Sequence, residues 1–166
     1  MNSINRVLVP MDFSECSRAA LAFAGARNEE WGAQLDVLHS IFVPAPVQPG
    51  ITGWVDVGAP KLPSKQETQA RMRALISGIP ELDPDCLNYL VAHGKPERAA
   101  LALLEEGDYD LVVVGTHGRT GISRLLFGSV AEELVRHAPC PVITLRHSEI
   151  PPAVGASDRE LEAVAH

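Results

Sequence analysis

The chain has few of the features that mark membrane, secreted or metal-stabilised proteins. No apolar run approaches the length of a membrane span, and the sequence does not open on a basic segment followed by an apolar one. Its three cysteines, Cys16, Cys86 and Cys140, are widely spaced and form no Cys-x-x-Cys pair. We therefore expect a cytoplasmic protein without a membrane partner, whose thiols are reduced and lie in apolar positions.

Positive charge is also scarce. The 166 residues include 14 Lys and Arg against 21 Asp and Glu, which gives a formal net charge of −7. Because no basic or aromatic stripe interrupts this composition, nucleic acid is not predicted as a partner. The six histidines are dispersed without a metal-ligand spacing, so no metal site is predicted. His39 and His93 fall near predicted strand ends and are expected to be hydrogen-bonded structural groups.

An apolar content of 46% is enough for one globular domain whose core needs no disulfide or metal. Five apolar runs predict strands, and segments with helical spacing separate them. The predicted strands are residues 4–9, 34–42, 87–92, 111–114 and 141–145, and the predicted helices are one that begins near Asp12 or Ser14, then 64–79, 95–106 and 129–137. This alternation predicts a parallel α/β sheet with right-handed crossovers, in which ligands bind outside the carboxyl ends of the strands.

The most informative stretch is the glycine-rich segment 115–129, which follows a predicted buried strand and leads into a helix. Gly115 and Gly118 allow positive φ angles and close approach to a ligand, and the amides of the helix N-terminus attract negative charge. Residues 111–131 contain no Asp or Glu but include Arg119 and Arg124, so the segment favours an anion. The alternative is a tight turn with glycines placed for packing and solvated arginines.

Two residues near these loops have both a structural and a binding interpretation. Asp12 follows the first strand, where it or Ser14 can cap the next helix, and its carboxylate can also accept a hydrogen bond from a ribose hydroxyl. Ser129 and Glu132 have the spacing of a capping box, and the same hydroxyl can donate to a phosphate at the helix terminus. The two roles are not exclusive for either residue.

Two distant motifs resemble those of one family. Gly115-x-x-Gly118, nine further residues, Gly128-Ser129 and the run 137–142 resemble the nucleotide-binding signature of the universal stress protein family, and residues 9–14 resemble its opening. The resemblance covers about residues 4–146 and points to the ATP-binding subgroup. It implies an open five-stranded parallel sheet with helices on both faces, Rossmann-like or adenine nucleotide alpha hydrolase-like, with strand order 3-2-1-4-5. We expect a domain at residues 1–146 and a C-terminal tail at 147–166.

The resemblance also implies a ligand and a set of contacts. The ligand is ATP or another adenine nucleotide, accompanied by Mg²⁺ that the phosphates themselves help to hold. Ser40 departs from the valine that the family commonly has against the base. The predicted nucleotide-binding residues are Pro10, Asp12, Ser40, Gly115, Thr116, His117, Gly118, Arg119, Thr120, Gly128, Ser129 and Val130.

No catalytic residue is predicted. The chain has no Gly-x-x-x-x-Gly-Lys-Ser/Thr loop and no lysine in its glycine segment, so we expect a stress-response sensor or regulator with at most slow ATP hydrolysis. One alternative is an ATP-hydrolysing or adenylating enzyme of the related α/β superfamily that uses the long proline-rich segment 43–63 as a lid. In that segment Trp54 either covers a ligand or packs over the core edge. The other alternative is an interaction module without nucleotide.

The last predicted strand is the basis for predicting a partner subunit. The apolar run 141–145 begins with Pro141 and ends with Leu145, and at the edge of a sheet it would expose unpaired backbone groups. The family commonly pairs this strand across a twofold axis, so the resemblance implies a homodimer.

Overall fold

Five parallel strands form one sheet in the computed structural model, which describes residues 3–42, 62–116 and 128–146. The strands are β1 (Arg6–Pro10), β2 (Gln34–Ile41), β3 (Asn88–His93), β4 (Leu111–Gly115) and β5 (Val142–Leu145). The helices are α1 (Glu15–Trp31), α2 (Lys65–Ile76), α3 (Pro96–Glu106) and α4 (Ser129–His137), with a short 3₁₀ turn, η1, at Pro84–Cys86. The strand order is β3-β2-β1-β4-β5, which confirms the predicted topology.

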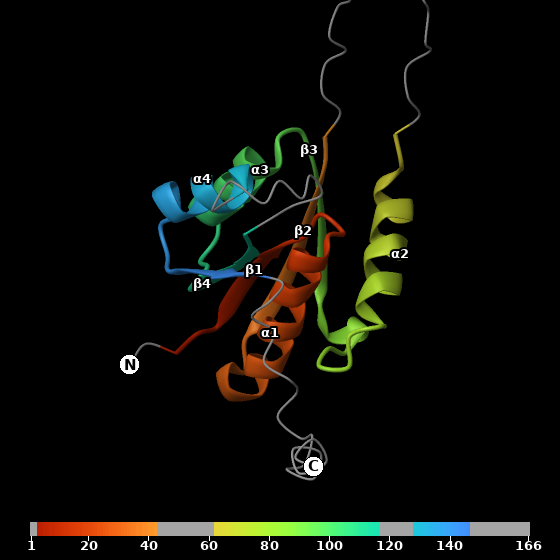
Figure 1. Ribbon diagram of the computed structural model, residues 1–166, viewed down its shortest axis with the longest axis horizontal. Coiled ribbons are helices and arrows are strands. Elements are labelled where there is room, and N and C mark those ends of the chain that lie inside the picture. The colour runs from red at the N-terminus through yellow and green to blue at the C-terminus, as the bar shows by residue number, and fades with distance from the viewer. Residues whose placement is uncertain (1–2, 43–61, 117–127, 147–166) are drawn as a thin grey trace, which may run out of the picture.

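The helices cover both faces of the sheet, as predicted (Figure 1). Val7 and Val9 of β1 face the side on which α1 and α2 contribute apolar residues, whereas Leu8 faces the side of α3 and α4. Both sets are fully buried. This arrangement explains the uninterrupted apolar runs of β1 and β4. Because helices cover both faces of the sheet, the side chains that point to either face are buried away from water.

Capping explains where α1 begins. Ser14 has extended φ/ψ angles, and its side chain accepts a hydrogen bond from the amide of Ser17, so Ser14 rather than Asp12 is the N-cap. The helix ends at Gly32, whose φ of 62° lies in the left-handed region that glycine adopts readily. The choice between Asp12 and Ser14 is thereby decided in favour of Ser14.

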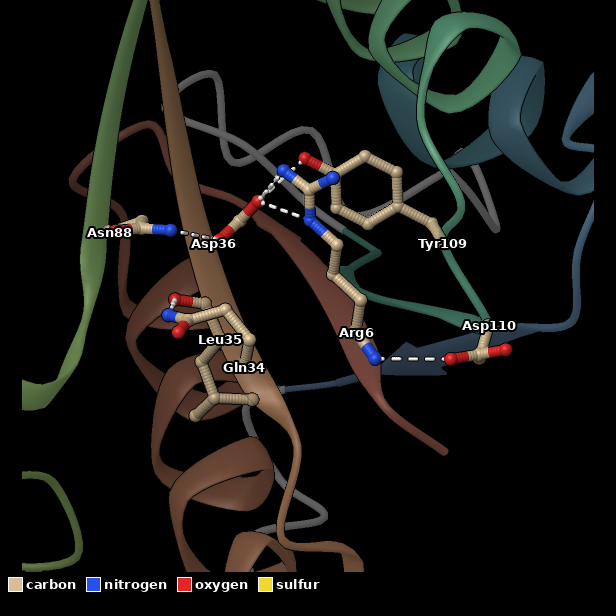
Figure 2. Close-up of polar contacts among 7 residues, drawn as sticks. All are labelled: Arg6, Gln34, Leu35, Asp36, Asn88, Tyr109 and Asp110. Atoms are coloured by element: carbon tan, nitrogen blue, oxygen red, sulfur yellow. Dashed lines mark hydrogen bonds and ion pairs between the residues drawn. The ribbon is translucent and has the colours of Figure 1, made fainter. Parts of the chain in front are cut away.

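A buried polar network closes the amino-terminal end of the sheet (Figure 2). Asp36 of β2 is 0% exposed and accepts hydrogen bonds from Nε and Nη2 of Arg6, at 2.9 and 2.7 Å, and from the Tyr109 hydroxyl at 2.7 Å. Its other oxygen accepts from Nδ2 of Asn88 at 2.9 Å. These donors come from β1, β3 and the turn before β4, so one carboxylate ties four strands together at their starts. Burial, with the bond to Asp36, raises the pKa of Tyr109.

Some expectations about single side chains are wrong. Cys16 is buried and Cys140 is partly buried, but Cys86 is exposed in η1, and its Sγ donates to Asp83. His39 is hydrogen-bonded as expected, with Nδ1 at 2.7 Å from the carbonyl oxygen of Met11. His93 is exposed, and its ring makes no hydrogen bond with the described residues.

Within the described ranges, no helix is long and apolar enough to cross a membrane.

Candidate nucleotide-binding site

A cavity of about 300 Å³ opens at the carboxyl-terminal ends of β1, β2 and β4. The chain order of the sheet reverses between β1 and β4, and ligands of open α/β sheets bind at such a switch point. The first turn of α4 forms part of the wall. The residues that line the cavity are Pro10, Met11, Asp12, Ser17, Leu38, His39, Ser40, Phe42, Pro96, Val114, Gly115, Gly128, Ser129, Val130 and Ala131.

The turn after β1 supplies the carboxylate of the cavity. Asp12 Oδ1 accepts hydrogen bonds from the amide of Ser14 at 3.0 Å and from the Ser14 hydroxyl at 2.5 Å. Ser17 is 4% exposed, and its hydroxyl donates to the carbonyl oxygen of Ser14 at 2.9 Å. The Asp12 side chain is therefore held in one orientation by the start of α1.

The end of β2 extends beyond the end of β1. The amide of Met11 donates to the carbonyl oxygen of Leu38 at 2.7 Å, so the peptide groups of Leu38 face β1. Strand alternation then directs the peptide N–H and C=O of Ser40 to the same side, where β1 has already ended. Within the part of the chain that the structure describes, these two groups have no backbone partner on that side, because the Met11 carbonyl instead lies against the His39 ring.

The Ser40 side chain does not enter the cavity as a ligand group. Its hydroxyl donates to the carbonyl oxygen of Gly94 at 2.7 Å, and Gly94 has a φ of 108° in the turn between β3 and α3. Serine in place of valine therefore anchors this turn. What Ser40 presents to the cavity is its backbone.

Gly115 is needed for packing rather than for an unusual backbone angle. A Cβ atom at this position would lie 2.6 Å from the carbonyl carbon of Cys16 and 2.7 Å from its oxygen, because the first turn of α1 crosses the end of β4. Among the described glycines, positive φ occurs at Gly32 and Gly94. Gly115 does not adopt the positive φ that glycine allows, and its close contact with α1 supports the packing interpretation for this glycine.

The predicted capping box at Ser129 is also wrong. The N-cap of α4 is Gly128, no side chain caps the helix, and Ser129 is already its first residue. Glu132 instead forms an ion pair with Arg136 at 2.8 Å, one turn further along the helix. Among the described residues, no side chain accepts a hydrogen bond from the first amides of α4, and these amides carry the partial positive charge of a helix N-terminus. The Ser129 hydroxyl is exposed at the same place.

The structure brings most of the predicted site residues to this one cavity. Those that line it are Pro10, Asp12, Ser40, Gly115, Gly128, Ser129 and Val130. Thr116 lies next to it but is 2% exposed, and its amide continues the sheet by donating to Leu145. His117, Gly118, Arg119 and Thr120 lie outside the described residues, as do Trp54 and the tail 147–166.

Sequence reasoning missed several lining residues. Met11 precedes Asp12 and His39 precedes Ser40, so their positions beside predicted site residues at strand ends were available signals. Ser17 lies in the first turn of α1, close to Asp12 in the chain. Pro96 begins α3, whose N-terminus reaches the cavity only because β3 lies beside β2. Among the described residues, no group of three His, Cys, Asp or Glu side chains is arranged to hold a metal ion.

A parallel α/β sheet with a cavity at its switch point and a helix N-terminus in the cavity wall defines a doubly wound α/β fold with a candidate ligand site. Residues 3–146 match the universal stress protein family, and the chain belongs to that family.

Relatives and solved structures agree with this assignment. A universal stress protein of Thermus aquaticus is 31% identical over 140 residues, which cover 84% of this chain and 97% of the relative. The structure of UspA from Lactobacillus plantarum has a TM-score of 0.65 at 22% identity, covering 88% of this chain and 100% of that one.

Two further structures with the same fold contain nucleotides. A universal stress protein in complex with cAMP has a TM-score of 0.62 at 23% identity, with coverage of 88% and 99%. A universal stress protein from Archaeoglobus fulgidus in complex with dAMP has a TM-score of 0.51 at 21% identity, with coverage of 87% and 98%.

Proposed function

We propose that the cavity binds an adenine nucleotide, with ATP as the preferred ligand, and that the protein acts as a cytoplasmic sensor or regulator in the stress response. The observation that carries the proposal is the convergence of seven predicted site residues, from three strand ends and one helix, on a single cavity. The cAMP and dAMP complexes of proteins with this fold support an adenine nucleotide as the ligand class.

The charge distribution supports one orientation of the nucleotide. Asp12 enters the cavity from the β1 side, and a carboxylate accepts hydrogen bonds from sugar hydroxyls but repels phosphates. The α4 N-terminus enters from the β4 side, where its amides favour phosphates. The sugar is therefore proposed to lie at Asp12 and the phosphates at Gly128, Ser129 and Val130, with the loop residues 117–120 completing the phosphate contacts.

The backbone of Ser40 supports adenine as the base. Its peptide N–H is a donor and its C=O an acceptor, and both face the cavity side on which β1 has ended. The hydrogen-bonding edge of adenine offers an amino donor beside a ring-nitrogen acceptor, which complements this pair. Guanine presents an acceptor oxygen and a ring N–H in the opposite arrangement, so the same backbone groups disfavour it.

The described groups of the cavity support binding rather than rapid turnover. Asp12 is held by Ser14, and Nδ1 of His39 lies against a backbone carbonyl, so the acid–base groups of the cavity are engaged in structural hydrogen bonds. Mg²⁺ is proposed to accompany ATP through the phosphates, because the ion keeps several waters and needs few protein ligands. At most slow hydrolysis is proposed.

The proposal is tested by the nucleotide content of the purified protein and by calorimetric titration of ATP with Mg²⁺. Asp12→Ala should weaken ATP binding about tenfold, because a hydrogen bond to a charged group is lost. Asp108→Ala, an exposed carboxylate removed at the other end of the sheet, is the matched control and should bind ATP normally. Well-folded protein that contains no nucleotide and gives no heat with ATP would refute the proposal.

The proposed assembly is a homodimer through β5, which lies at an edge of the sheet. The carbonyls of Pro141 and Leu145 accept hydrogen bonds from the amides of Val112 and Thr116, so alternation turns the peptide groups of Val142 and Thr144 outward. No side chain of the described residues binds these outward groups. On β3, the opposite edge, Nε2 of Gln69 donates to the carbonyl oxygen of Tyr89 at 2.8 Å.

Light scattering at micromolar concentration tests the dimer. Thr144→Pro removes an outward amide without removing a bond to β4, and it should shift the mass from dimer to monomer. A monomeric mass for the unmodified protein would contradict the assembly. The proposed domain spans residues 1–146, with a tail at 147–166, and the family match over residues 3–146 supports this division.

A further inference from the structure

Asp12 is the single carboxylate among the described residues that line the cavity, and Ser14 sets its orientation. Both the amide and the hydroxyl of Ser14 donate to the same oxygen, Oδ1, at 3.0 and 2.5 Å. Two donors on one oxygen fix the plane of the carboxylate. A group held in this way does not lose rotational freedom when a ligand binds.

The Ser14 hydroxyl has a second role that does not compete with the first. It accepts the amide of Ser17 at 3.2 Å as the N-cap of α1. Because a carboxylate oxygen only accepts, the hydroxyl proton must be directed to Asp12 while a lone pair receives the Ser17 amide. One side chain therefore links the start of α1 to the orientation of Asp12.

The turn between Asp12 and Ser14 is also held from outside the cavity. Phe13 has a φ of 66°, a conformation that costs about 1 to 2 kcal/mol for a residue other than glycine. Its ring packs against His39 at a centroid distance of 4.7 Å, and the guanidinium of Arg71 lies 4.0 Å from the ring centroid. These contacts offset the strained angle, so the turn keeps its shape without a ligand.

We propose that Ser14 is a positioning residue that presents the Asp12 carboxylate to the sugar of the nucleotide, and that it thereby makes the cavity select ribonucleotides over deoxyribonucleotides. The inference rests on the proposed adenine-nucleotide function and deepens it. A ribose offers two neighbouring hydroxyl donors to the fixed carboxylate. A deoxyribose lacks one of them and therefore forms one hydrogen bond fewer to this carboxylate, which costs binding free energy.

The experiment titrates ATP, 2′-deoxyATP and 3′-deoxyATP into the unmodified protein and its variants by calorimetry. The unmodified protein should bind ATP about tenfold more tightly than at least one deoxy analogue. Ser14→Ala should reduce this ratio to about twofold or less, because Asp12 Oδ1 loses the hydroxyl donor that helps to orient the carboxylate. Ser14→Thr retains a hydroxyl at the same position and should restore the ratio.

Ser64→Ala is the matched control. Ser64 caps α2 through a capping box with Glu67, and neither residue lines the cavity, so this variant loses a comparable helix cap without touching Asp12. It should keep the preference for ATP over the deoxy analogues. If Ser14→Ala does not fold, Ser14→Asp replaces it, because aspartate retains a cap acceptor but supplies no side-chain donor to Asp12.

The ratio of affinities separates the possible outcomes. An unmodified protein that binds ATP without preferring it to either deoxy analogue overturns the positioning role and leaves nucleotide binding intact. The same holds if Ser14→Ala, or Ser14→Asp in its place, keeps the full preference. Loss of the preference in Ser64→Ala would assign the effect to helix stability and also overturn the role. If the protein binds none of the three nucleotides, the proposed nucleotide-binding function itself is refuted.

Discussion

At the amino-terminal end of the sheet Asp36 is fully buried and accepts hydrogen bonds from Arg6, Asn88 and Tyr109, whereas at the carboxyl-terminal end β1 stops before β2 and a cavity remains. The first end satisfies its polar groups with one another (Figure 2). The second leaves peptide groups and a helix N-terminus directed at a cavity. The contrast separates two requirements of the protein: one end of the strands is closed by internal hydrogen bonds that stabilise the fold, and the other is the end at which we propose that a ligand binds.

The largest expected effect comes from Asp36→Ala. This variant leaves Tyr109 and Asn88 without their acceptor and Arg6 without its ion-pair partner, and it should lower the free energy of unfolding by about 3 to 5 kcal/mol. Urea denaturation measures the loss. Asp12→Ala, the corresponding carboxylate at the cavity end, should lose ATP affinity with a much smaller loss of stability. Equal losses of stability in the two variants would remove the distinction between the ends.

Gly115→Ala is expected to be the next largest effect, because it places a packing defect beside the cavity. The added Cβ meets backbone atoms of Cys16, which cannot move away as a flexible side chain can, so the cost should be about 1 to 3 kcal/mol. Gly78→Ala is a suitable comparison, since its Cβ would lie 3.4 Å from Nη2 of Arg18 and from the carbonyl oxygen of Leu75, which is ordinary van der Waals contact. Thermal unfolding of the two variants should show a clear loss for Gly115→Ala alone. A stable Gly115→Ala protein would mean that α1 can shift away from β4.

A smaller effect is expected from Tyr109→Phe, which removes only the hydroxyl that donates to Asp36. The loss should be about 1 to 2 kcal/mol at neutral pH. Burial raises the pKa of Tyr109 above its ordinary value near 10, so the protonated phenol contributes stability that is complete below about pH 10 and is lost as pH rises further. The difference in unfolding free energy between the two proteins should therefore shrink in alkali. A constant difference would show that the bond to Asp36 is not the cause.

The smallest effect is expected from Asp110→Asn. The amides of Asn5 and Arg6 donate to Asp110 Oδ2 at 2.7 and 3.0 Å, and these bonds lower the pKa of Asp110. A lowered pKa contributes stability that is present above about pH 4 and is lost as the pH falls through the folded-state pKa. Denaturation from neutral to acidic pH should show the variant slightly less stable at pH 7 and equal to the unmodified protein in strong acid. A gap that widens in acid would contradict this sign.

The two ends of the sheet also differ in how much of their structure the sequence predicted. The order of strands and helices, the site at the glycine segment and the candidate Asp12 all followed from local patterns or from the family resemblance. The cavity brings Asp12, Ser40 and Ser129 together as those patterns implied. No role was predicted for Asp36, however, although a carboxylate within the apolar run of a buried strand indicates a buried polar network.

The roles of individual residues depended on neighbours that are distant in the chain. Gly115 is required by the backbone of Cys16, the Ser40 hydroxyl is taken by Gly94, and the helix after Gly128 begins too early for Ser129 to cap it. Each of these follows from how elements pack on the sheet, and no spacing within one segment encodes it. The sequence was therefore informative about which residues gather at the site and less so about what each one does there.

By itself the sequence determined the alternation of elements and the double-sided core, because hydrophobic periodicity acts over a few residues. Tertiary structure decided that Ser14 holds Asp12, that β2 extends beyond β1, and that Asp36 is enclosed by three partners. These features arise where separate segments meet, and the free energy of a hydrogen bond or a close contact depends on atoms that only the folded chain brings within reach.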